Sequence, residues 1–311
     1  MTSSYRTSAL STAAYNAGAS SFSSSSSSSS SVAAVRLFSL TKMPSSSSSP
    51  RSFFRHEQQS TTSKVVHLVR HAEGTHNLDE SESKLPMHFD APLTPGGVGQ
   101  CRALAERTIS LDVDAVLVSP MTRCLETARL SFPHLYYHPD DDDGGRRPNE
   151  DRRIGGGGGD GAVEATAVPF VAHEEWRETV NYLCDSRRTK SSLRGLYPRV
   201  SFDDLVSECD PIWTRYEGIF GPHDAHTSRR ESDDPTSLLD RARSAWGALL
   251  DRPERNLALV GHSAFFMHMF TPLHRELEGV VVYEDEGVEE LMTKSMFDNC
   301  ELRSVLVDVP R

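Results

Sequence analysis

Short runs of apolar residues that end abruptly recur along the chain and predict the strands of a buried sheet. A run of roughly four to eight apolar residues bounded by turn-forming residues is typical of a parallel strand covered on both faces. Four such runs are Val65–Val69, Asp114–Ser119, Ala167–Ala172 and Asn256–Val260. The segment Glu301–Val309 alternates apolar and polar residues and is expected to form a final strand.

Longer segments between these runs repeat apolar residues every three or four positions and predict helices. In the first, Thr94 is expected to be the N-cap and Pro95 the first helical residue, and glycines in the opening turn indicate that another backbone or a substrate approaches closely. The predicted helices are Leu93–Ile109, Thr122–Leu130, Phe202–Glu217, Pro235–Leu250 and Ala264–Phe270. Strands separated by helices predict a three-layer α/β/α sandwich with a mostly parallel central sheet.

Composition divides the chain into a leader and one large domain. Residues 1–63 are dominated by serine, include several basic residues and contain no acidic residue before Glu57. Such a segment buries too little apolar surface to fold, so we expect a disordered leader, either a plain extension or an organelle transit peptide. Residues 64–311 are expected to form a single domain, with a flexible, solvated insertion at 138–161 rich in aspartate, arginine and glycine.

Net charge, the length of apolar stretches and cysteine content indicate which partners and which cellular compartment to expect. The formal net charge of −11 disfavours nucleic-acid binding, which needs a basic surface. No apolar stretch approaches the roughly 20 residues that span a bilayer, so no membrane association is expected. The five cysteines form no C-x-x-C pair and indicate a reducing, intracellular compartment. That compartment is the cytoplasm, or a mitochondrion or plastid if the leader is a transit peptide, and the oligomeric state is left open.

Three of the predicted strands deliver a cationic or imidazole side chain at the same end. Arg70 and His71 follow the first strand, Arg123 follows the second, and His262 follows the strand that begins at Asn256. Ligands of open α/β sheets bind just beyond the carboxyl ends of the strands. One Arg-His pair after a strand is more often a surface turn, but the repetition predicts that these groups share one site.

Two arginines and two histidines around a small pocket suit a dianionic phosphoryl group. Guanidinium groups bind phosphate oxygens bidentately, and a neutral imidazole nitrogen in line with phosphorus can form a phosphohistidine. The leaving alkoxide then needs a proton from a carboxylic acid with a raised pKa. The candidates are Glu174, Glu175 and Glu178. We therefore expect a small phosphorylated substrate and neither a metal ion nor an organic cofactor.

Five segments in this order resemble the histidine phosphatase superfamily in its phosphoglycerate mutase-like branch. The segments are RHAEGTHN (70–77), LTPGGVGQ (93–100), SPMTRCLETA (119–128), WRE (176–178) and VGHS (260–263). The CDSRR (184–188) and NCELRS (299–304) segments are similar to those of plant and fungal members. The resemblance covers nearly all of residues 64–311 and implies the phosphoglycerate mutase-like fold.

The resemblance also implies a role for each site residue. His71 corresponds to the phosphate acceptor, Arg70, Arg123 and His262 to the phosphate pocket, and Asn77 to an asparagine beside it. The family's acid follows an arginine or glutamine and precedes the Cys-Asp dipeptide by a few residues. Among the three glutamates this implies Glu178 as the acid.

Departures from the family favour hydrolysis over phosphate transfer between substrates. Ala72 and Gly74 stand where the family commonly has glycine and serine, and no clear motif holds a second phosphorylated substrate. The activity implied is a phosphatase, with a phosphoglycerate mutase-type transferase as the alternative. Arg187 and Arg188 were candidates for substrate contact, although a solvated basic pair is expected.

Three other classes of function are compatible with parts of the sequence. A serine hydrolase is disfavoured because Gly261–Phe265 has phenylalanine where a G-x-S-x-G elbow needs a small residue, and no suitable acid and histidine follow. A metal hydrolase is disfavoured because His67, His71 and His76 lack the usual ligand spacing, and His67 is expected to pack beside its strand. A non-catalytic phosphoester-binding module remains a third interpretation.

Overall fold

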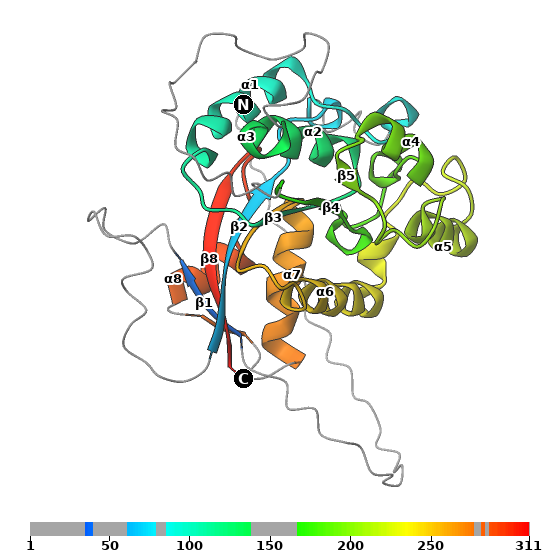
Figure 1. Cartoon of the computed structure of the whole chain (residues 1–311). Helices are drawn as coiled ribbons and strands as arrows, with labels where there is room; N and C mark the ends of the chain where they lie inside the picture. The colour runs from blue at the N-terminus through cyan, green and yellow to red at the C-terminus, as the bar shows by residue number, and fades with distance from the viewer. Residues whose placement is uncertain are drawn as a thin grey trace, which may run out of the picture. The chain divides into compact units, whose positions relative to one another are not determined.

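A mixed sheet with the order β5-β4-β3-β6-β2-β8-β1-β7 forms the centre of the fold (Figure 1). The computed structural model describes residues 35–39, 61–78, 85–137, 167–276, 281–283 and 286–310. The strands are β1 (Val35–Ser39), β2 (Thr61–Arg70), β3 (Ala115–Val118), β4 (Phe170–Ala172), β5 (Val200–Ser201), β6 (Asn256–Gly261), β7 (Val281–Tyr283) and β8 (Leu302–Pro310).

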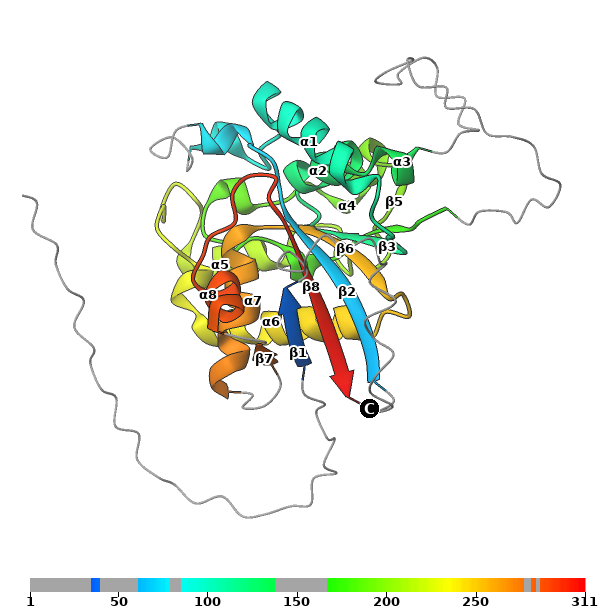
Figure 2. The same ribbon diagram turned by 90° about the vertical axis from the view of Figure 1, so that its left-hand side faces the viewer.

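Five adjacent strands, from β5 through β2, run parallel, and their register aligns their carboxyl ends. Val260 of β6 lies opposite both Val69 of β2 and Val118 of β3, and Val118 lies opposite Ala172 of β4. Strand β8 is antiparallel to β2 and β1 and lies between them (Figure 2). The residues that follow β2, β3, β4 and β6 therefore meet at one edge of the sheet.

Helices cover both faces of the sheet and confirm the predicted three-layer α/β/α sandwich. Figure 1 shows α1, α2 and α3 above β3 and β4, with α6 and α7 below them. The helices are α1 (Pro95–Thr108), α2 (Thr122–Ser131), α3 (Pro133–Tyr136), α4 (Lys190–Leu196), α5 (Pro211–Phe220), α6 (Pro235–Leu250), α7 (Ser263–Glu276) and α8 (Glu286–Thr293). None of these described helices is long and apolar enough to cross a bilayer.

Alternate residues of each central strand enter two separate cores. Leu117 of β3 and Leu259 of β6 pack with apolar side chains of α6, α7 and α8. Val118 and Val260 face the other way and pack with α1 and α2. Because the side chains of a strand alternate between faces, continuous apolar runs are needed to supply both cores.

Several local signals are confirmed. Helix α6 has the predicted bounds, and the Thr94 side chain accepts a hydrogen bond from the backbone N–H of Gly97 (2.9 Å). A Cβ atom at Gly97 would collide with the backbone of Glu73, which explains a glycine in this turn.

Several predicted boundaries differ from the structure. Strand β2 begins at Thr61, inside the expected leader, and α7 extends to Glu276 instead of ending at Phe270. Helix α5 begins at Pro211 rather than Phe202, because the Asp210 carboxylate accepts from the N–H of Trp213 (2.8 Å) and starts the helix there. Val35–Ser39, inside the segment expected to lack structure, forms β1, which pairs with β8 and β7. This pairing with distant strands is invisible in the local composition. Most of the leader and the insertion at 138–161 lie outside the described residues.

Candidate active site

A pocket of about 550 Å³ opens at the aligned carboxyl ends of the strands. It is lined by Arg70, His71, His76, Asn77, Arg123, Glu178, Thr179, Asn181, Tyr182, Cys184, Asp185, Ala264 and Asn299. His262 is fully buried beside it, with its ring 5.1 Å from the ring of His71, centroid to centroid. The structure therefore brings together all six residues that the sequence nominated for this site.

The His71 ring is held in one tautomer. Its Nδ1 lies 2.8 Å from the carbonyl oxygen of Ala72, which only accepts, so Nδ1 carries the proton and Nε2 keeps a free lone pair. Burial, reinforced by the Arg123 charge, lowers the pKa of His71 well below its ordinary value. A neutral imidazole with an available nitrogen is the form required of a nucleophile.

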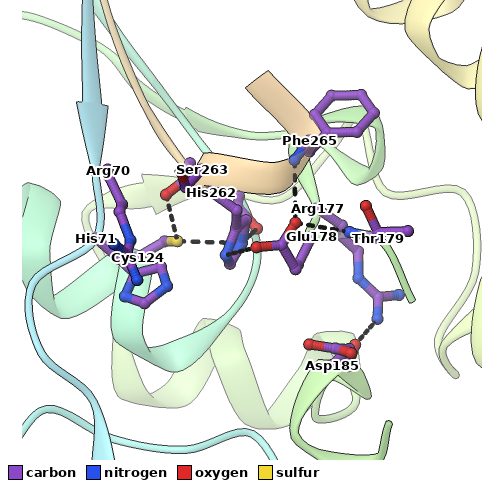
Figure 3. Close-up of polar contacts among 12 residues, drawn as sticks. Arg70, His71, Cys124, Arg177, Glu178, Thr179, Asp185, His262, Ser263 and Phe265 are labelled. Atoms are coloured by element: carbon purple, nitrogen blue, oxygen red, sulfur yellow. Dashed lines mark hydrogen bonds and ion pairs between the residues drawn. The ribbon is translucent and has the colours of Figure 1, made fainter. Parts of the chain in front are cut away.

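The two ring nitrogens of His262 face different side chains. Its Nε2 lies 2.9 Å from the hydroxyl of Ser119, and its Nδ1 lies 4.0 Å from Oε2 of Glu178 (Figure 3). Burial, with Arg123 next in importance, lowers the pKa of His262 well below its ordinary value. Nη2 of Arg123, which can only donate, lies 3.5 Å from the same Nδ1, so Nδ1 accepts and Nε2–H donates to the Ser119 hydroxyl.

The two arginines are anchored by backbone carbonyls. Nη1 of Arg70 donates to the carbonyl of Phe297 (2.6 Å), and Nη1 of Arg123 donates to that of Cys184 (2.7 Å). Nη2 of Arg123 lies 3.5 Å from the Asp185 carboxylate. In both guanidinium groups the buried Nε has no hydrogen-bond partner within the described part of the chain. Anchored cations with unsatisfied donors suit an anionic ligand.

Glu178 is the one of the three candidate glutamates that lines this pocket. Its Oε1 accepts hydrogen bonds from the N–H groups of Thr179 (2.9 Å) and Phe265 (3.0 Å), shown in Figure 3. Burial and, second, the negative charge of Asp185 raise the pKa of Glu178. The side chain of Glu174 instead pairs with Arg177 and Arg187, and Glu175 lines a different pocket.

Some residues of the pocket were not nominated from the sequence. Asp185 lies within CDSRR and Asn299 begins NCELRS. Both segments carry the family resemblance, but the resemblance predicts no role for either side chain. Asn299 donates to the carbonyl of His71 (3.2 Å). Asn77, which was nominated, lies at the exposed rim and accepts from the N–H of Gly74 (3.0 Å).

The expectation of a solvated basic pair is wrong for Arg187. Its side chain is buried against Glu174 and carbonyl groups, because these fixed acceptors compensate the loss of water around the guanidinium. Arg188 does lie at the surface, with a side chain that is 39% exposed and an ion pair to Asp90.

His67 packs beside its strand as predicted, with Nδ1 at 2.7 Å from the Ser304 hydroxyl. The described residues hold no cluster of three or more side chains suited to a metal ion.

The segment that carries Glu178 is held by a buried arginine of α6. Arg241 donates to the carbonyl oxygens of Arg177 (2.8 Å) and Glu178 (3.1 Å) and forms an ion pair with Glu231 (2.7 Å). Glu231 in turn accepts from the N–H of Val180 (2.7 Å). This buried pair fixes the backbone on both sides of Glu178.

Arg241→Met is expected to lower the free energy of unfolding by about 3–5 kcal/mol, because it leaves Glu231 buried without its partner. Urea unfolding measures the loss. Arg243→Met, which breaks an exposed ion pair to Asp240 on the same helix, serves as the matched control and should cost less than about 1 kcal/mol. Equal losses in the two variants would contradict the role of the buried pair.

Comparisons with the sequences of known proteins indicate one family. Residues 66–144 match the model of the histidine phosphatase superfamily, branch 1. Phosphoglycerate mutase-like protein 1 of Arabidopsis thaliana is 30% identical over 253 residues, which cover 78% of this chain and 81% of the relative. A second Arabidopsis thaliana phosphoglycerate mutase-like protein is 28% identical over 259 residues, covering 78% and 84%. The solved structure of an ecdysone phosphate phosphatase from Bombyx mori aligns with a TM-score of 0.43 and 15% identity, over 78% of this chain and 88% of that one.

Proposed function

The chain belongs to the histidine phosphatase superfamily, among its phosphoglycerate mutase-like proteins, and on that premise we propose that it is a phosphomonoester hydrolase acting through His71. The observation that carries the proposal is the free Nε2 of a neutral His71 in a pocket with two anchored arginines. Its substrate is a small phosphate ester. Neither a metal ion nor an organic cofactor takes part in the proposed steps.

In the first step Nε2 of His71 attacks phosphorus. The N–P bond forms, the bond to the ester oxygen breaks, and the protonated Glu178 carboxyl gives its proton to the departing alkoxide. Arg70 and Arg123 stabilise the charge on the three remaining phosphoryl oxygens, with the His262 imidazole beside them. The products are the alcohol and a phosphohistidine.

In the second step water releases the phosphoryl group. The Glu178 carboxylate takes a proton from water as its oxygen bonds to phosphorus, and the N–P bond breaks to give inorganic phosphate and neutral His71. Each group thus returns to its starting protonation state. In a mutase the acceptor would be a second substrate hydroxyl instead of water, so the two activities differ only in the second step.

The proposal is tested by mixing the protein with ³²P-labelled phosphoester, quenching within milliseconds and following the label. A phosphohistidine predicts protein-bound label that is labile to acid and stable to base, together with release of inorganic phosphate. Transfer of the labelled phosphoryl group from the protein to an added alcohol or phosphoglycerate, without release of inorganic phosphate, would identify a mutase. A protein that binds phosphoesters but is never labelled would be a binding module.

The rate on esters with poor leaving groups is expected to fall as pH rises through the raised pKa of Glu178, since the acid must be protonated. His71 should add no acidic limb near neutrality, because its lowered pKa keeps it neutral there. The measurement is the ratio of kcat/KM for glycerol 2-phosphate to that for p-nitrophenyl phosphate against pH. Because the two phosphates ionise at different pH, each kcat/KM is first divided by the fraction of the substrate that is dianionic. A ratio that does not change with pH would contradict the assignment.

A further inference from the structure

We infer that this pocket selects phosphate esters of neutral, hydroxyl-rich alcohols, such as polyol and sugar phosphates, over esters that carry a carboxylate or a second phosphate. The inference rests on the proposed function of the same site and adds the class of substrate. It follows from the charges of the pocket wall and from its unpaired neutral groups.

The positive charge in the described part of the pocket is confined to Arg70 and Arg123. Both are assigned to the reacting phosphoryl group, and their Nη1 atoms are already bound to carbonyl oxygens. The acidic side chains of the wall are Glu178, which is protonated when the ester binds, and Asp185, which is paired with Arg123. Among the described residues of the wall a second anionic group on the substrate would therefore find no cation left to bind, and it would add negative charge beside Asp185.

The remaining unpaired polar groups of the pocket are neutral. Thr179 is 3% exposed, and its Oγ1 has no hydrogen-bond partner among the described residues. The same holds for the buried Nδ1 of His76, whose pKa is lowered to about 2 by burial, so the ring is uncharged. An unpaired buried hydroxyl or imidazole nitrogen costs free energy, and a substrate hydroxyl that pairs with it removes this cost.

The neighbouring amide does not offer the same contact. The Oδ1 of Asn181 accepts from the N–H groups of Arg230 and Ser232, and its Nδ2 donates to the Ser232 hydroxyl. The Asn181 side chain is therefore fully paired, whereas Thr179, next to the proposed acid (Figure 3), and His76 still have an unpaired neutral atom for a substrate hydroxyl. The pocket volume of about 550 Å³ lies within the range of small-molecule sites and leaves room beyond a phosphate group.

Charge selection is tested with esters that differ in one group. Glycerol 2-phosphate becomes 2-phosphoglycerate when one CH₂OH is replaced by a carboxylate. We expect kcat/KM to be at least about tenfold higher for the neutral ester, and the same order for glucose 6-phosphate over 6-phosphogluconate. Equal values, or a preference for the acids, would overturn the inference.

Thr179→Val, which keeps the side-chain shape and removes the hydroxyl, tests the neutral contact. The ratio of kcat/KM for glucose 6-phosphate to that for p-nitrophenyl phosphate should fall about tenfold, the effect of one lost hydrogen bond. Thr179→Ser should restore the ratio. Thr214→Val, the same change on exposed α5, is the matched control and should leave the ratio unchanged.

Failure of the two proposals can be told apart. If no ester, p-nitrophenyl phosphate included, is hydrolysed, the proposed function fails. If esters are hydrolysed but the acids are preferred or the Thr179→Val ratio is unchanged, only the substrate class fails.

Discussion

His71→Ala is expected to abolish the trapped phosphoenzyme and to reduce kcat by roughly 10⁴-fold or more, as removal of a nucleophile does elsewhere. The reason is geometric: Nε2 of His71 is the unpaired nitrogen of a ring whose other nitrogen is fixed by the Ala72 carbonyl. Rapid-quench labelling and steady-state phosphate release measure the two effects. Label that survives in His71→Ala would refute the assignment.

Three further variants complete this test. His76→Ala removes the neighbouring imidazole, whose ring centroid lies 5.5 Å from that of His71, and should retain the phosphoenzyme. His134→Ala, on the exposed surface of α3, controls for loss of a histidine and should match the wild type. Loss of label in His76→Ala alone would move the nucleophile to His76. His71→Asn, checked by urea unfolding, separates loss of chemistry from loss of folding.

Glu178→Gln is expected to slow esters of poor leaving groups by about 10²–10⁴-fold, the usual range for a general acid. An activated aryl ester needs little protonation of its leaving group, so the rate of its phosphorylation step should fall much less. The burst of nitrophenol measures that rate. Glutamine preserves the hydrogen bonds that Oε1 accepts from Thr179 and Phe265, so the backbone around the site should be unchanged. Equal slowing of both esters in this step would count against the role.

Glu175→Gln is the matched control for this variant. Its side chain belongs to the same short segment but lines another pocket, so neither ester should be affected. A loss in Glu175→Gln that equals the loss in Glu178→Gln would show that the effect comes from the segment as a whole.

Local signals in the chain were sufficient for most of the fold. The helix Pro235–Leu250 was predicted from its 3.6-residue apolar repeat, and the structure has the same helix. The apolar runs before Arg70 and after Asn256 became adjacent parallel strands, β2 and β6, because such runs are stable only when covered on both faces. Where the signal depends on a distant partner, as for Val35–Ser39 against β8, composition was misleading.

The site also combines residues that local sequence patterns predict with contacts that depend on distant parts of the chain. Apolar runs in the chain predict that Arg70, His71, Arg123 and His262 lie at or just after the ends of strands, and strand order then brings them to one edge of the sheet. The choice of Glu178 came from the family resemblance, and its place in the pocket rests on contacts between residues far apart in the chain, such as that from the N–H of Phe265.

The tautomer of His71, the pairing of Asp185 with Arg123 and the unpaired hydroxyl of Thr179 could be seen only in the folded protein. The two kinds of feature differ in how far apart in the chain the interacting residues lie. Strand and helix formation depend on residues a few positions apart, whereas burial and charge depend on every element that packs around a group, and those neighbours come together only in the folded chain.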